Sequence, residues 1–65
     1  MTPYSLVLYF AVGGPLVPYQ GISQDTCDAY LRASRRPPHV IALVEYPDLE
    51  RAVCRPDPWF VPRWR

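Results

Sequence analysis

The residues of this chain that are best able to do covalent chemistry are its two cysteines, Cys27 and Cys54. A disulfide between them would stabilise the fold by roughly 3.5 kcal/mol in the loop-entropy model. Two reduced cysteines buried as small apolar side chains are the alternative, and this is their normal state in a reducing cytosol. The sequence leaves both states open. No metal site is expected, because two cysteines and one histidine at these spacings match no zinc finger or ribbon.

The single histidine gives no sign of catalysis. His39 follows two prolines, and no serine or cysteine stands near it in a recognisable nucleophile pattern. The six carboxylates are scattered over predicted caps, turns and strands, where acids commonly act as helix caps or solvated surface. We therefore expect a protein that is not an enzyme and that uses no cofactor.

Length and composition indicate one small globular domain. Hydrophobic residues make up 49% of the 65 residues and charged residues 20%, which is not the composition of a disordered chain. Because so short a chain buries little surface, its fold needs a covalent cross-link or a binding partner for stability. All seven basic residues are arginine, but six acids reduce the net charge to +1. Overall charge therefore gives no attraction for nucleic acid or an anionic membrane.

No segment has the features of a membrane span or a signal peptide. The first apolar run, residues 6–12, is too short to cross a bilayer and has no basic residue before it. It ends at Gly13-Gly14-Pro15, which is not a cleavage site of small residues. We therefore expect a cytoplasmic protein that acts where it is made.

One helix is predicted within residues 21–36. Ser23 is a good N-cap, acids follow it, and arginines stand near the other end, in agreement with the helix dipole. Cys27, Tyr30, Leu31 and Ser34 fall on one face, which predicts the buried side of the helix. The two prolines at 37 and 38 end it.

Strands are predicted on both sides of this helix. Residues 4–12 are apolar on both faces, as in a central strand, and residues 16–20 contain Pro18, which suits an edge strand hairpinned onto the first. Residues 39–46 are predicted to be a third strand, with a turn at Pro47 and Asp48. Residues 49–55 would then return antiparallel to it and place Cys54 on the helix side. A short helix over residues 49–54 is the alternative.

The predicted fold is therefore α+β, of order β-β-α-β-β, with one helix packed on a small antiparallel sheet. Residues 1–55 form the domain. Residues 56–65 form an extended tail that contains three prolines and three aromatic residues. Aromatic side chains at this density pack either on their own domain or on a partner.

The predicted binding residues lie on the sheet face away from the helix and in the tail. Arginine and aromatic side chains are enriched in the energetically dominant parts of protein interfaces. Coverage of this sheet face by the tail is the alternative to a partner surface. The candidates are Tyr46, Arg51, Arg55, Trp59, Phe60, Arg63, Trp64 and Arg65.

The chain also resembles a class of viral proteins. Its basic residues are all arginine, and an apolar hairpin precedes the segment SQDTCDAYLRAS and a strand ending in AVC. In these features and in its brevity it is similar to short accessory reading frames of bacteriophages with GC-rich genomes. This resemblance implies a small protein that binds a host protein and alters its activity, but it assigns no residue to a site.

Three functions remain as hypotheses. The first is a protein-binding module that inhibits or modulates a host protein by occlusion. The second is a nucleic-acid-binding accessory protein that uses the arginines of the helix end and tail, with affinity that falls steeply with salt. The third is a structural protein that associates with itself, for example as a homodimer.

Overall fold

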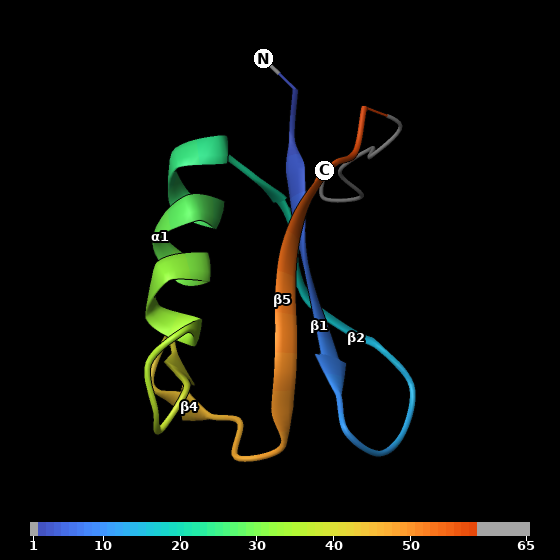
Figure 1. Cartoon of the computed structure of the whole chain (residues 1–65). Coiled ribbons are helices and arrows are strands. Elements are labelled where there is room, and N and C mark those ends of the chain that lie inside the picture. Colours follow the sequence, from blue (N-terminus) through green and yellow to red (C-terminus); the bar gives the residue numbers. More distant parts are fainter. Residues whose placement is uncertain (1, 59–65) are drawn as a thin grey trace.

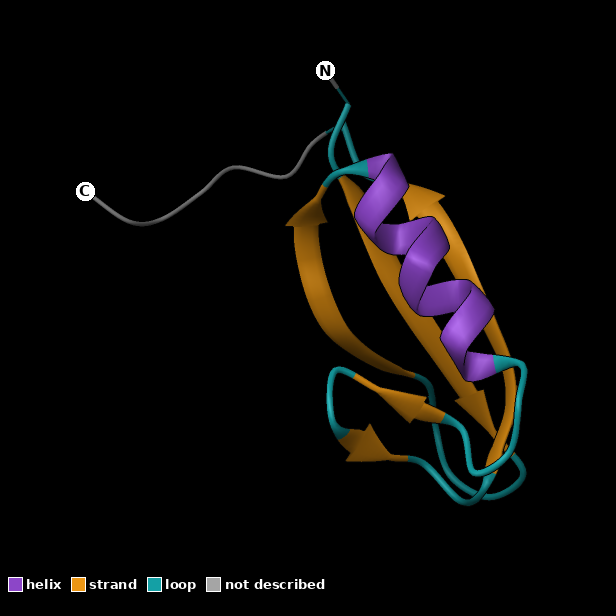
Figure 2. Cartoon of the chain, turned by 90° about the vertical axis from the view of Figure 1, so that its left-hand side faces the viewer, coloured by secondary structure: helices purple, strands orange, loops and turns teal. Residues whose placement is uncertain are grey.

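The structure is a computed structural model that describes residues 2–58. Its elements are β1 (Tyr4–Phe10), β2 (Leu16–Ile22), α1 (Gln24–Ser34), β3 (Val40–Ile41), β4 (Val44–Glu45) and β5 (Leu49–Pro56). Three strands form an antiparallel sheet of order β2-β1-β5, and β3 and β4 form a separate small hairpin. Helix and hairpin lie on the same side of the sheet (Figures 1 and 2). The predicted class, one helix on a small antiparallel sheet, is confirmed.

Helix α1 begins and ends close to where the sequence predicts. Ser23 is the N-cap, and its hydroxyl oxygen accepts a hydrogen bond of 3.1 Å from the backbone N–H of Thr26. This bond satisfies one of the free donors of the first turn. Cys27 and Ser34 are the buried residues of α1, so the predicted face is the one that packs on the sheet.

Strand β1 is the central strand, as predicted, and β2 pairs with it in an antiparallel hairpin. β1 is shorter than predicted and ends at Phe10, and Gly13 in the connecting loop has a φ of 96°, which favours glycine. The pairing of β1 with β2 contains two irregularities. Pro18 is accommodated because β2 is an edge strand with one side free.

The predicted third strand over residues 39–46 is wrong. The chain reverses at Ala42 and Leu43, whose φ angles are 48° and 69°, so that β3 pairs with β4. The backbone N–H of Tyr46 donates to the carbonyl of His39 at 3.1 Å and closes this hairpin. Two left-handed residues in succession are the geometry of a tight two-residue turn, which usually requires Asn or Gly.

Strand β5 is a strand and not a helix, but it does not pair with residues 39–46. It pairs antiparallel with β1 instead, with Cys54 opposite Leu6 and Ala52 opposite Leu8. The predicted turn before β5 is present, since the N–H of Leu49 donates to the carbonyl of Tyr46 at 3.1 Å. Cys54 therefore reaches the helix side through a long-range pairing.

The core lies between the sheet and the layer formed by α1 and the hairpin. Its fully buried side chains are Leu6 and Leu8 from β1, Cys27 from α1 and Ile41 from β3. Phe10, Tyr19 and Tyr30 are among the partly buried residues packed around them. Since this core is small, the fold depends on further stabilisation.

Candidate functional site

Cys27 and Cys54 form a disulfide, which decides between the two states that the sequence leaves open. Their Cα atoms are 6.0 Å apart, and the bond joins α1 to β5 across the core. Cys27 is fully buried. The disulfide therefore has a structural role, because it links the helix layer to the sheet.

His39 lies just beyond the C-terminal end of α1, where it and Ser34 line a hollow between the helix end and β5. Its Nδ1 is 2.7 Å from the carbonyl oxygen of Ser34, so in the tautomer with a proton on Nδ1 it donates to a carbonyl of the last helical turn. The hydroxyl of Ser34 donates to the carbonyl of Leu31 at 2.6 Å. Side chains that bond these carbonyls replace the missing helical partners.

Arg51 and Arg55 lie on the sheet face opposite α1, where the sequence predicts them. They stand across from Tyr9 and Ser5 of β1, which alternate with the core residues of that strand. The guanidinium carbon of Arg51 is 4.6 Å from the centre of the Tyr9 ring. A cation over an aromatic face at this distance is favourable and orients the arginine along the sheet.

Tyr46 is not on that face, which corrects the prediction. It packs against the core beside Phe10, with 6.1 Å between the ring centres. The prediction fails because it assumes that residues 39–46 pair with β5. Tyr46 instead follows the small hairpin and closes the end of the core on the helix side.

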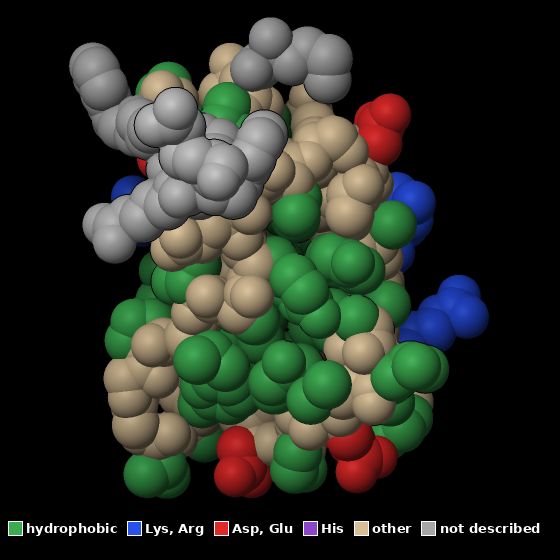
Figure 3. All heavy atoms as spheres, turned by 180° about the vertical axis from the view of Figure 1, so that it is seen from behind, with side chains coloured by type: hydrophobic (Ala, Val, Ile, Leu, Met, Phe, Trp, Pro, Cys, Tyr) green, Lys and Arg blue, Asp and Glu red, His purple; other side chains and the backbone are tan. Residues whose placement is uncertain are grey.

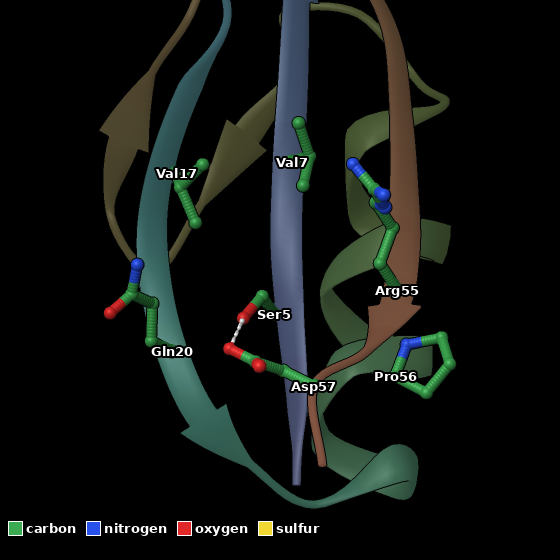
Figure 4. A pocket seen from close by; sticks show the side chains of 7 residues that line it. All are labelled: Ser5, Val7, Val17, Gln20, Arg55, Pro56 and Asp57. Carbon is green, nitrogen blue, oxygen red and sulfur yellow. Dashed lines mark hydrogen bonds between the residues drawn. The ribbon is translucent and has the colours of Figure 1, made fainter. Parts of the chain in front are cut away.

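The outer sheet face carries a shallow hollow of about 370 Å³. Val7 and Val17 project from β1 and β2 toward it, and Arg55 stands on its β5 side (Figure 4). At one end the hydroxyl of Ser5 donates to a carboxylate oxygen of Asp57 at 3.3 Å. The hollow combines apolar side chains with an arginine, a pattern suited to contact with another chain.

The beginning of the predicted tail lies against this face. The backbone N–H of Asp57 donates to the carbonyl of Pro3 at 2.8 Å, beyond the end of β5. The remaining predicted binding residues of the tail lie outside the described residues. They are Trp59, Phe60, Arg63, Trp64 and Arg65.

The most exposed large apolar side chain among the described residues stands at the tip of the small hairpin. Leu43 is 97% exposed, and its backbone is in the left-handed region, as is that of Ala42 before it. For residues with a Cβ this conformation costs about 1 kcal/mol at each position. Strain of this kind persists where the surrounding structure enforces it, and it is concentrated at functional positions.

The hairpin carries other exposed apolar side chains besides Leu43, and together with one from β2 we call them the hairpin face. Figure 3 views the molecule from the β2 side and shows hydrophobic side chains gathered over the lower part of this side, with acidic side chains along the bottom. Exposed apolar groups of this kind mark interaction sites when they are contiguous. The hairpin face comprises Leu16 of β2, which stands opposite the core residue Leu8, with Val40, Leu43 and Val44 of the hairpin.

Sequence reasoning misses the hairpin face. Residues 39–46 have an unbroken apolar pattern without Gly, Asn or Asp at the reversal, so no local signal indicates a turn. The two prolines before this segment and the one after it are the only indication that its strands must be short.

Comparison of the chain with protein-family models, with curated proteins and with solved structures found no match. Within residues 2–58, no helix has the length and apolar character needed to cross a membrane. The same residues contain no cluster of three or more His, Cys, Asp or Glu side chains that could hold a metal ion.

Proposed function

We propose that this chain is a small non-catalytic module that binds a partner protein through the hairpin face and acts by occluding it. The observation that carries the proposal is Leu43, a leucine held almost fully exposed on a strained turn. Folding gains nothing from a leucine at this position, because it buries no surface there. Transfer of such a side chain into a partner's pocket would contribute about 2 kcal/mol to binding.

The surroundings of Leu43 support a protein as the partner. Val40 and Val44 flank it on the hairpin, and Leu16 adds apolar surface from β2. Such a surface offers shape and apolar contact, which are the features of the buried centre of a protein interface. The resemblance to phage accessory proteins implies that this partner is a host protein whose activity is changed.

The test compares two substitutions at adjacent positions of the same turn. Leu43→Gly and Ala42→Gly both relieve a left-handed residue, but only the first removes the exposed side chain. The tagged wild-type chain and both variants are used to capture proteins from bacterial lysate, which are identified by mass spectrometry. We expect a protein that is recovered with wild type and Ala42→Gly and is reduced at least about tenfold with Leu43→Gly.

Equal recovery by all three chains, or no recovery above the tag alone, would contradict the proposal. Self-association through the same face is the competing explanation. The molar mass of the chain in solution distinguishes the two. If it rises with concentration in the wild type but not in Leu43→Gly, the hairpin face binds a second copy of the chain and not a different protein.

A further inference from the structure

The second edge of the sheet carries an inference about the chemistry of the partner. Within residues 2–58, β5 pairs only with β1, and in Figure 1 it is the strand nearest the viewer. Its other edge is therefore not paired with any described strand. We infer that the free edge of β5 binds an extended, acidic segment of a partner protein by β-strand addition; this deepens, and rests on, the proposed protein-binding function.

The backbone groups that point to this edge follow from one hydrogen bond. The N–H of Asp57 donates to the carbonyl of Pro3, so Asp57 and Pro3 form a hydrogen-bonded pair. In an antiparallel ladder such pairs alternate with residues whose N–H and C=O point away from the neighbour. Counting back along β5, Arg55 and Val53 bond to β1. Ala52 and Cys54 direct their N–H and C=O groups to the free edge.

β5 is also the more suitable of the two edge strands. It runs from Leu49 to Pro56 and follows β1 with one irregularity, close to its start. β2 contains Pro18 and two irregularities, both of which protect an edge against pairing. The regular edge of β5 lacks these protections up to Pro56.

The charge beside this edge selects the kind of segment that fits. The arginines of the described chain lie in the last turn of α1, directly after this helix and on β5: Arg32, Arg35, Arg36, Arg51 and Arg55. A hollow of about 330 Å³ between the end of α1 and β5 is lined by two arginines, Arg35 and Arg51, and by one acid, Glu50, so positive charge predominates there. Side chains of an added strand would enter this hollow on one face and meet Arg55 on the other. Carboxylates suit both environments, because arginine binds them with paired hydrogen bonds.

Other occupants fit less well. A second copy paired antiparallel on β5 would bring two rows of arginines together, and like charges across strands are destabilising. The chain's own residues 59–65 contain two arginines and no acid. A nucleic acid would not use the backbone groups at Ala52 and Cys54, whereas an added strand would pair with them.

Binding of defined peptides tests the inference without knowledge of the natural partner. The probe is a short fluorescent peptide of alternating valine and glutamate, titrated with the full chain at low salt and followed by anisotropy. We expect saturable binding. A matched valine and lysine peptide, and a valine and glutamate peptide with all backbone nitrogens methylated, should each bind at least about tenfold more weakly.

Two double variants separate the strand edge from general charge. Arg51→Gln with Arg55→Gln should weaken binding of the acidic peptide about tenfold. Arg32→Gln with Arg36→Gln removes the same charge from the helix end and should change it by less than about threefold, because these exposed arginines do not line the hollow beside β5.

Each opposite result overturns the inference. Equal binding of the methylated peptide means that charge alone is responsible, and equal binding of the lysine peptide removes the acidic preference. Binding of single-stranded DNA in place of the peptide, with steep salt dependence, assigns the edge to nucleic acid. Leu43→Gly should bind the peptide like wild type, so a negative peptide result alongside capture that depends on Leu43 refutes only this inference.

Discussion

At the scale of single residues, Leu43 and Ala42 distinguish a functional explanation from a structural one. Both adopt a conformation that residues with a Cβ avoid, and neither contributes to the core. A protein selected for stability alone would carry Asn-Gly at such a turn. In the proposed function, this turn is kept for the surface that it displays.

The same two residues give a prediction about stability. We expect Leu43→Gly to leave the free energy of unfolding unchanged or to raise it by up to about 1 kcal/mol, because relief of the left-handed strain offsets the greater freedom of glycine in the unfolded chain. Urea denaturation measures this value. A fall of about 2 kcal/mol or more would show that Leu43 supports the fold and would remove the main argument for its role in binding.

The disulfide gives a second prediction at this scale. Replacement of both Cys27 and Cys54 by alanine should lower the free energy of unfolding by roughly 3.5 kcal/mol, because the unfolded chain regains the freedom of the loop between them. The midpoint temperature of thermal unfolding should be the same for this variant and for reduced wild type.

If the double variant does not fold, thiol titration still tests the pairing. Wild type denatured without reductant should show no reactive thiol. Two reactive thiols, or a variant as stable as wild type, would contradict the structural role of the disulfide.

At the scale of secondary-structure elements, the β3–β4 hairpin depends on one buried side chain. Ile41 is fully buried in the core, whereas its neighbour Val40 is 37% exposed. Ile41→Ala should lower the free energy of unfolding by about 2–5 kcal/mol, and Val40→Ala by less than about 1 kcal/mol. Urea denaturation of both variants measures the difference, and equal effects would contradict the packing of β3 described here.

Elements with local signals are the ones that the sequence predicts well. The Ser23 cap, the buried face of α1 and the β1–β2 hairpin depend on residues close together in the chain, and all three are confirmed. Residues 39–46 are predicted wrongly because their composition contains no signal for the chain reversal at Ala42 and Leu43. The pairing of β5 with β1 is also missed, since it joins segments far apart in sequence.

The sequence also predicts the sheet face of two of the candidate binding residues correctly, and their role in binding stays a prediction. Arg51 and Arg55 lie on the outer face whichever strand β5 pairs with, because side chains alternate along any strand. Tyr46 is misplaced because its position depends on the wrong pairing. Cys54 faces the helix whether β5 pairs with residues 39–46, as predicted, or with β1, as observed, because side chains alternate along the strand. The predicted sheet face of Cys54 is therefore correct, although the predicted neighbouring strand is wrong.

At the scale of the whole molecule, stability and exposed surface divide between two sides of the fold. The disulfide and the buried residues join α1 and the hairpin to the sheet, whereas apolar side chains are left exposed along β2 and the hairpin. A small domain with this distribution is stable enough to fold and still presents surface that a partner can cover.

Amide hydrogen exchange on the complex with the captured partner tests the central claim most directly. The wild-type chain is measured free and bound, and exchange is followed for each segment. Slower exchange in the bound state at residues 40–46 and in β2, with α1 unchanged, is the result that we predict. Exchange at the hairpin that is as fast in the complex as in the free chain would contradict binding through the hairpin face.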